Sequence, residues 1–203
     1  MTAVVDIQNL EVTFATDGGD IVAVDKVSLV ANAGEVVAIV GESGSGKSVT
    51  AKTIIGLLPE TAVTKGAILL NGQNVIGLTG EKLRATRGLD AAMVFQEPST
   101  ALNPVYTVGW QLSEGLRAHG KYSKKQARAK AIEYLAKVGI PDPEQRVDYF
   151  PHQFSGGQKQ RVMIAMALSL DPELIIADEP TTALDVTVQA EILDLLRRCR
   201  DEF

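Results

Sequence analysis

The sequence predicts an α/β fold, because segments typical of strands and segments typical of helices alternate along the chain. Two short apolar runs carry the strand signal, residues 36–40 and residues 174–177. The first run is continuous and therefore typical of a strand buried on both faces. A glycine-rich loop follows it, and a helix is expected over residues 48–58, where Pro59 would end it. This alternation favours a mostly parallel sheet with helices on its faces.

The first third of the chain is dominated by strand and turn signals. Residues 4–14 and residues 21–30 alternate loosely between apolar and polar side chains, and a turn cluster at residues 17–20 separates them. Residues 67–70 form a further apolar segment, and the Asn-Gly dipeptide at residues 71–72 is a strong turn signal. We therefore expect these three segments to form strands, in addition to residues 36–40.

Helix signals dominate the middle of the chain and return near its end. Ser123 and Gln126 are spaced as a capping box, which predicts a helix start at Ser123, and Gly139 is placed to end that helix. Further helices are expected over residues 157–170 and residues 186–200. The sequence contains no internal repeat and no low-complexity linker.

Composition limits the possible classes of protein. With 203 residues, 45% of them hydrophobic, the chain can bury a sizeable core as one large domain or two small ones. The net charge of −5 argues against a protein that binds the nucleic-acid backbone, which would need a basic face. Cys199 is the single cysteine, so a reducing compartment fits. No apolar run approaches the roughly 20 residues that cross a bilayer, so a membrane connection is expected only through a partner.

The glycine-rich loop matches the phosphate-binding P-loop pattern and has a strand signal before it and a helix signal after it. Gly44 and Gly46 would let the backbone amides point at phosphate oxygens. Lys47 would reach the β- and γ-phosphates, and the Ser48 hydroxyl would ligate Mg²⁺. The alternative is a flexible loop with an incidental lysine. The expected nucleotide-binding residues are Gly41, Glu42, Ser43, Gly44, Ser45, Gly46, Lys47 and Ser48.

Two carboxylates follow the apolar run at residues 174–177. In P-loop proteins a second strand delivers an aspartate to magnesium, which makes Asp178 the candidate metal ligand. Glu179 would then face the γ-phosphate and accept a proton from the attacking water. The alternative is an ordinary acidic turn before Pro180.

A third motif, Phe-Ser-Gly-Gly-Gln-Lys-Gln-Arg at residues 154–161, resembles the signature of the ABC ATPase family, which reads LSGGQ. The chain departs from it only at Phe154, an apolar exchange for leucine. The resemblance implies that the motif covers the γ-phosphate of the ATP held by a partner cassette, with Ser155, Gly156, Gly157 and Gln158 as the binding residues. The alternative is a serine-capped helix that begins with two flexible glycines.

The same resemblance assigns three further residues. Gln96 matches the Q-loop glutamine, which couples the Mg²⁺ and water site to the membrane partner and would contribute to metal binding and catalysis. Asp185 matches the D-loop aspartate at the dimer seam. Phe14 stands where the family places an aromatic ring on adenine, although packing in the core is a comparable alternative.

The resemblance implies a P-loop NTPase (RecA-like) core with an N-terminal antiparallel β subdomain and a helical signature subdomain. Core and β subdomain would comprise about residues 1–101 and 158–203, and the helical subdomain about residues 102–157. Residues 97–104 and 183–190 look like those of oligopeptide, dipeptide and nickel importers.

The implied function is ATP binding and Mg²⁺-dependent hydrolysis that powers import, at the cytoplasmic face of the membrane. The expected partners are a second cassette arranged head to tail, transmembrane permease subunits and, indirectly, an extracytoplasmic solute-binding protein, with no nucleic acid.

The family also carries a histidine on a later strand that contacts the γ-phosphate. His119 and His152 are the only histidines and neither follows Asp178, so the sequence leads us to expect a C-terminally truncated cassette that hydrolyses ATP weakly. Two alternatives stay open. One is a soluble ABC protein of DNA repair or translation, which would usually carry long insertions or a second cassette. The other is a nucleotide-binding subunit that does not hydrolyse ATP.

Overall fold

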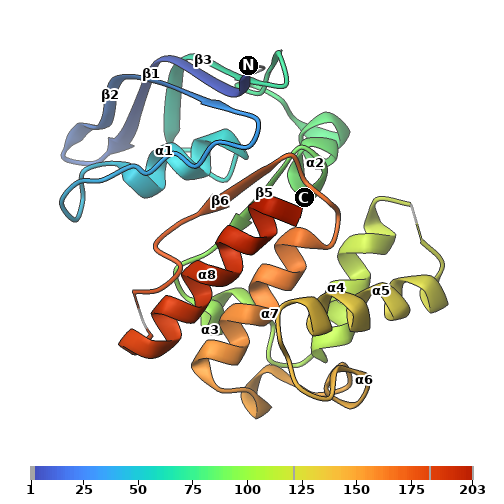
Figure 1. Cartoon of the computed structure of the whole chain (residues 1–203). Helices are drawn as coiled ribbons and strands as arrows, with labels where there is room; N and C mark the ends of the chain where they lie inside the picture. Colours follow the sequence, from blue (N-terminus) through green and yellow to red (C-terminus); the bar gives the residue numbers. More distant parts are fainter. Residues whose placement is uncertain (1–2, 121, 183, 203) are drawn as a thin grey trace. The chain divides into compact units, whose positions relative to one another are not determined.

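The computed structural model describes residues 3–120, 122–182 and 184–202, and it divides into two compact units, residues 1–91 and residues 92–203. Figure 1 shows the chain coloured from blue to red along the sequence. We describe each unit by itself.

The first unit is built on a four-stranded antiparallel sheet in the order β2-β1-β3-β4. Its strands are β1 (Ala3–Thr16), β2 (Gly19–Asn32), β3 (Ala62–Leu70) and the short β4 (Gln73–Asn74). Val5, Ile7, Leu10 and Val12 of the central strand β1 are all buried, and the change of spacing after Ile7 coincides with a register shift in both of its pairings. Strand β1 therefore contributes a large part of the unit's core, together with Ile68 and Leu70 of β3.

Two helices complete the first unit. Helix α1 (Lys47–Ile54) contacts β2, and α2 (Gly80–Leu89) follows β4 in sequence (Figure 1). Arg87 donates hydrogen bonds to the carbonyls of Ile55 at 2.8 Å and of Gly56 at 2.6 Å, and thereby ties α2 to the end of α1.

The second unit packs its helices around α7. Its elements are β5 (Ala91–Val94), α3 (Pro98–Ala101), α4 (Val108–Ala118), α5 (Lys124–Lys137), α6 (Pro143–Arg146), a 3-10 turn (Pro151–Gln153), α7 (Gly156–Leu168), β6 (Leu174–Ala177) and α8 (Val186–Glu202). Strands β5 and β6 pair with each other. Helix α7 contacts α3, α4, α5 and α8, and Figure 1 shows it between α8 on one side and α4 and α5 on the other. Its buried residues, such as Val162 and Ile164, form the centre of the unit's core.

Most of the elements predicted from the sequence are confirmed. The three expected N-terminal strands are β1, β2 and β3, and Asn71 (φ 50°) and Gly72 (φ 80°) form the predicted turn after β3. Ser123 and Gln126 form the capping box of α5, and Gly139 (φ 78°) follows the end of that helix. Strand β6 and helices α7 and α8 lie where the sequence places them, within about two residues.

Two expectations are wrong, the strand at residues 36–40 and the end of the first helix. Residues 36–40 form no strand, and Val36 and Val40 are 67% and 91% exposed. A strand exists only where its backbone groups find partners on a neighbour, and no strand in the described part of the chain pairs with this segment. The larger sheet is antiparallel in all its pairings, as expected for the N-terminal β subdomain. Helix α1 ends before Pro59, because Gly56 takes a left-handed conformation at φ 61°.

The expected division into core and helical subdomain differs from the two units, and it stays a prediction. No helix in the ranges that the structure describes is long and apolar enough to cross a membrane.

Candidate active site

The P-loop residues lie in the first unit, between the irregular segment 35–42 and α1. Gly46 caps the helix with φ 89°, and a Cβ built there would lie 2.4 Å from the carbonyl oxygen of Ala23 on β2. Backbone so close leaves no room for any side chain, so glycine is required at this position. The amide of Ser45 donates to the carbonyl of Glu42 at 3.2 Å and closes the turn of the loop.

Lys47 lies back across this loop. Its Nζ donates to the carbonyl oxygens of Gly41 at 2.9 Å and of Glu42 at 2.7 Å. A cation is thereby held against an exposed, glycine-rich turn at the start of a helix, where backbone amides and the helix dipole favour an anion. Ser48 is the second residue of α1 and is half-buried. The backbone amides of this segment and the ammonium group of Lys47 can donate hydrogen bonds to phosphate oxygens.

The acidic pair lies in the second unit, at the end of β6. Asp178 is 8% exposed, and its amide donates to the carbonyl of Val94 on β5 at 3.0 Å. Glu179 has φ 45°, a left-handed conformation that non-glycine residues rarely adopt and that costs about 1–3 kcal/mol. Such conformations cluster at functional sites, where surrounding contacts hold them. The acidic pair therefore lies on a strained turn at the end of β6.

Two side chains hold the carboxylate of Glu179. Its Oε2 accepts hydrogen bonds from Nε2 of Gln96 and from Oγ1 of Thr182, both at 3.0 Å. Gln96 and Glu179 are 83 residues apart in the sequence, and the pairing of β5 with β6 brings their strand ends together. The arrangement fixes an exposed carboxylate in one orientation, which is what a general base requires.

Thr182 was missed by the sequence reasoning. The available signal was a hydroxyl three residues after Glu179, within reach across a tight turn, and the amide of Thr182 does donate to the carbonyl of Glu179 at 3.3 Å. A threonine in that position is common in turns, so the spacing alone did not single it out.

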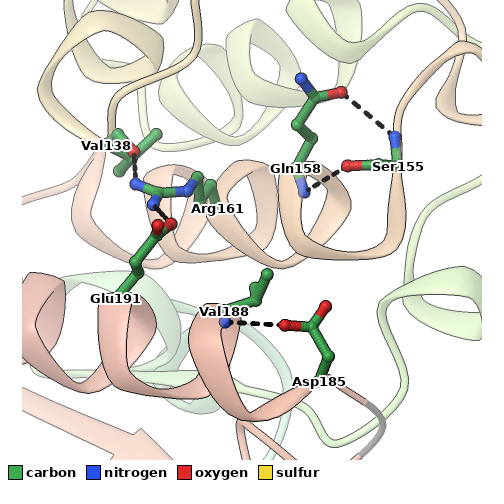
Figure 2. Close-up of polar contacts among 7 residues, drawn as sticks. All are labelled: Val138, Ser155, Gln158, Arg161, Asp185, Val188 and Glu191. Carbon is green, nitrogen blue, oxygen red and sulfur yellow. Dashed lines mark hydrogen bonds and ion pairs between the residues drawn. The ribbon is translucent and has the colours of Figure 1, made fainter.

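The signature residues begin α7. Ser155 caps the helix: its Oγ accepts from the amide of Gln158 at 3.3 Å, and Oε1 of Gln158 accepts from the amide of Ser155 at 3.1 Å (Figure 2). The alternative interpretation, a serine-capped helix, thus describes the local structure correctly. It does not exclude a binding role, since Gly156 and Gly157 occupy the first turn, where amides lack helical partners. Phe154 is buried beside Tyr149, so it belongs to the core.

The remaining predicted residues lie as follows. Asp185 is exposed and accepts a hydrogen bond from the amide of Val188 at 3.0 Å, as a cap at the start of α8. Ala183, beside it in the expected D-loop, lies outside the described residues. Phe14 is half-buried on β1, opposite Ile21 and Ala62. His152 stacks on Phe150 at the surface, as expected of a packing histidine.

The structure brings together Gln96 with Glu179, and Ser155 with Gln158. In the ranges that are described, no group of three or more His, Cys, Asp or Glu side chains could hold a metal ion. A magnesium ion carried by nucleotide phosphates needs only one or two protein ligands, so this finding leaves Ser48, Gln96 and Asp178 as candidates.

Comparison with known proteins gives a consistent result. A family described as "ABC transporter" matches residues 24–182. The chain is 53% identical over 199 residues to the dipeptide transport ATP-binding protein DppD of Bacillus subtilis (strain 168), which covers 97% of this chain and 59% of that protein. It is 50% identical over 202 residues to the oligopeptide transport ATP-binding protein OppD of Mycobacterium tuberculosis (strain ATCC 25618 / H37Rv), covering 99% of this chain and 33% of that one. The chain therefore spans about a third to three fifths of the length of these relatives.

Solved structures agree with the sequence relatives. The dimeric structure of MJ0796, described as a bacterial ABC transporter cassette, superimposes with a TM-score of 0.85 at 32% identity and covers 98% of this chain and 83% of that one. A post-hydrolysis state of the same cassette bound to ADP and Pi gives a TM-score of 0.84 at 32% identity, with the same shares covered. The fold is that of an ABC cassette, with the antiparallel β subdomain predicted from the sequence. This chain belongs to the ABC transporter family.

Proposed function

We propose that this chain binds and hydrolyses ATP and thereby powers peptide import through membrane-embedded partner subunits. The observation that carries the proposal of hydrolysis is the carboxylate of Glu179, held by Gln96 and Thr182 at 3.0 Å each. The relatives named as dipeptide and oligopeptide transport ATP-binding proteins support the substrate class.

The P-loop would bind the phosphates of ATP. Lys47 already forms two charge-assisted hydrogen bonds with carbonyl oxygens of the loop, and phosphate oxygens would offer it stronger, charged acceptors. The backbone turn at Gly46 keeps its shape because no side chain competes with Ala23 for space. Phe14 is the proposed contact for adenine.

Magnesium is the ion that oxygen donors of this kind suit, with Ser48, Gln96 and Asp178 as the proposed ligands. When bound, it would neutralise negative charge on the phosphates. The burial of Asp178 suits such a role, since a carboxylate withdrawn from water interacts more strongly with a nearby cation.

Glu179 would accept the proton of the water that attacks the γ-phosphate. Its two hydrogen-bond donors orient the carboxylate, and Oε2 is the oxygen that they hold. The other oxygen, Oε1, is then the one oriented to receive a proton. In this proposal Gln96 has two roles, as a metal ligand and as a support of the base.

Ser155, Gly156, Gly157, Gln158 and Asp185 are proposed to act on the nucleotide of a second cassette arranged head to tail. The dimeric state of the similar MJ0796 cassette supports this part of the proposal. The start of α7 carries amides without helical partners, and the Ser155 hydroxyl lies beside them.

Permease subunits at the cytoplasmic face of the membrane are the proposed partners, with an extracytoplasmic solute-binding protein acting through them. An exposed aromatic pair in the second unit supports such a contact: Tyr106 and Trp110 stack with ring centroids 4.0 Å apart, and they are 41% and 46% exposed. Exposed apolar surface of this kind marks protein contacts.

Single-turnover hydrolysis with labelled ATP tests the core of the proposal, because it detects slow reactions. We expect Lys47→Ala to weaken ATP binding by tenfold or more, and Lys52→Ala, on the last turn of the same helix, to leave it unchanged. Glu179→Gln should keep ATP affinity and lower the hydrolysis rate by about 10²–10³. Hydrolysis by Glu179→Gln at the wild-type rate would contradict the role of the base, and wild-type affinity in Lys47→Ala would contradict the nucleotide site.

A further inference from the structure

Helices α7 and α8 touch at two successive turns, and the second contact involves two residues, Arg161 and Glu191, that have no role in the proposed chemistry. At the first turn, a Cβ built on Gly157 would lie 2.7 Å from Cγ1 of Val188, so α8 packs directly on the helix backbone there. At the next turn, Nη2 of Arg161 lies 2.7 Å from Oε2 of Glu191 (Figure 2). Steps of four residues on α7 and three on α8 are those of ridges fitting into grooves.

Arg161 also holds a third helix. Its Nη1 donates to the carbonyl oxygen of Val138 at 2.7 Å, at the C-terminal end of α5 (Figure 2). That carbonyl belongs to the last turn, where helical partners are missing and the dipole favours a cation. The next residue is Gly139, and a Cβ added there would lie only 3.0 Å from the same Nη1 of Arg161. One guanidinium therefore joins the end of α5, the middle of α7 and the second turn of α8.

The contacts of Arg161 hold in place the N-terminal ends of α7 and α8, which carry their capping residues. Ser155 caps α7 six residues before Arg161, and Asp185 caps α8 six residues before Glu191. The side chain of Arg161 is only 17% exposed, whereas that of Glu191 is 55% exposed, so the guanidinium is the enclosed member of the pair. An enclosed, forked donor with two acceptors at 2.7 Å keeps a single geometry.

We infer that Arg161 is a positioning residue: through Glu191 and the Val138 carbonyl it locks α8 onto α7, and so sets where Asp185 lies relative to Ser155. The inference rests on the proposed function, in which both caps face a second cassette. Two surfaces that must meet one partner at the same time gain affinity when their spacing is fixed beforehand.

The test compares Glu191→Ala with a matched control, Asp148→Ala. Asp148 forms an equally short pair with Arg128, at 2.7 Å, which joins α5 to the segment after α6 and involves no cap of α7 or α8. Both substitutions remove a half-exposed carboxylate from an arginine, so their effects on global stability should be similar and small. Three quantities are measured for the full chain: amide hydrogen exchange at Val188, ATP affinity of the monomer, and Mg-ATP-dependent self-association by sedimentation.

We expect Glu191→Ala to raise exchange of the Val188 amide and to weaken self-association, each by about three- to tenfold, with monomer affinity for ATP unchanged. Asp148→Ala should change none of the three. If Glu191→Ala behaves like Asp148→Ala in both exchange and association, the inference is wrong while the proposed function stands. If the wild type does not self-associate with Mg-ATP, the proposed role of the caps fails, and exchange at Val188 alone decides whether Arg161 locks α8.

Discussion

Thr182 supports the proposed base through one hydrogen bond that its hydroxyl donates to Oε2 of Glu179 at 3.0 Å. A hydrogen bond to a charged group contributes about 1.5–3 kcal/mol, and this one holds the carboxylate in one orientation. Gln96 holds the same oxygen from the other strand end, so loss of Thr182 leaves one of two supports.

We therefore expect Thr182→Val to lower the single-turnover hydrolysis rate by about 10- to 100-fold without changing ATP affinity. Valine keeps the shape of threonine and removes only the donor. Thr181→Val, at the neighbouring position, is the control, because it removes a hydroxyl of the same turn and leaves the hydrogen bond from Thr182 to Glu179 in place. Equal rates in Thr182→Val and the wild type would show that Gln96 alone orients the base.

Gly157 is a second position whose role is set by a neighbouring element, because Val188 of α8 occupies the space that a side chain would need. From the sequence, an aspartate at position 157 looks like a test of charge repulsion across a dimer seam. The structure shows that any side chain there first meets Val188, at 2.7 Å from Cγ1, within the same chain. Since valine is stiff about χ1, the clash cannot be relieved by a simple rotation.

Gly157→Ala should lower the free energy of unfolding by about 1–3 kcal/mol, because the added methyl group forces α8 to move away from α7. Gly156→Ala is the matched control: its Cβ would meet only Cδ2 of Leu184, at 3.8 Å, which is ordinary contact. Alanine is the better helix former, so this control should be neutral or stabilise the chain by about 0.5 kcal/mol. Equal destabilisation by both variants, measured by urea unfolding, would contradict the packing argument.

Tyr134 joins α5 to the turn before β6, since its hydroxyl donates to the carboxylate of Asp171. Burial, followed by this hydrogen bond, raises the pKa of the Tyr134 phenol well above its ordinary value. Because the phenol has a higher pKa in the folded chain, it stays protonated there at a pH where the unfolded chain has lost the proton. Its contribution to the free energy of unfolding is therefore complete below the unfolded pKa of about 10 and is lost as the pH rises above it. Lys130 and Lys137 lie over the ring at 5.2 and 4.8 Å and favour the phenolate, but the net direction is upward.

We accordingly expect the free energy of unfolding of the wild type to fall between about pH 9 and pH 11 more steeply than that of Tyr134→Phe. At pH 7 the variant should be less stable by about 1 kcal/mol, because it lacks the hydrogen bond to Asp171. Denaturant unfolding of both proteins at several pH values gives the comparison. If the free energies of unfolding of the two proteins change with pH in the same way across the alkaline range, the pKa of the Tyr134 phenol is the same in the folded and unfolded chains.

Local signals predicted most elements well, and the wrong prediction at residues 36–40 has a non-local cause. The capping box at Ser123 and the Asn-Gly turn depend on residues a few positions apart, so sequence patterns reveal them. Residues 36–40 have the composition of a buried strand, yet a strand also needs a partner, and composition does not specify one. The same limit hid the contact of Arg161 with Glu191, whose members are 30 residues apart.

The proposed site was predicted unevenly for the same reason. The P-loop and the acidic pair are contiguous motifs, and each was found from its own residues. Gln96 was assigned only through family resemblance, and its hydrogen bond to Glu179 depends on the pairing of β5 with β6. Thr182 belongs to none of the predicted motifs, and Arg161 ends the signature motif without a role assigned to it, because both roles depend on where the side chain points in the fold.

For the molecule as a whole, the proposed role requires a surface that binds a partner other than a second cassette. We propose that the exposed aromatic residues of the second unit form this surface. Tyr106 and Trp110 stack at the start of α4, and Phe150 is 36% exposed on a segment tied to α4 by the hydrogen bond from the Val108 amide to the Tyr149 carbonyl, at 2.8 Å. Aromatic side chains in such clusters contribute much of the affinity of protein interfaces.

Trp110→Ser should therefore weaken binding to co-expressed permease subunits in detergent by tenfold or more, and leave ATP affinity of the isolated chain unchanged. Its effect on stability should be small, because the indole is 46% exposed and surface substitutions usually change stability by less than about 0.5 kcal/mol. Val63→Ser is the control, since Val63 is also apolar and exposed, at 54%, but lies on β3 in the first unit. Permease binding is measured by affinity capture with quantified yields. If Trp110→Ser retains wild-type binding, the aromatic pair does not form the contact; if Val63→Ser loses binding as well, exposed apolar area in general, rather than this surface, accounts for the capture.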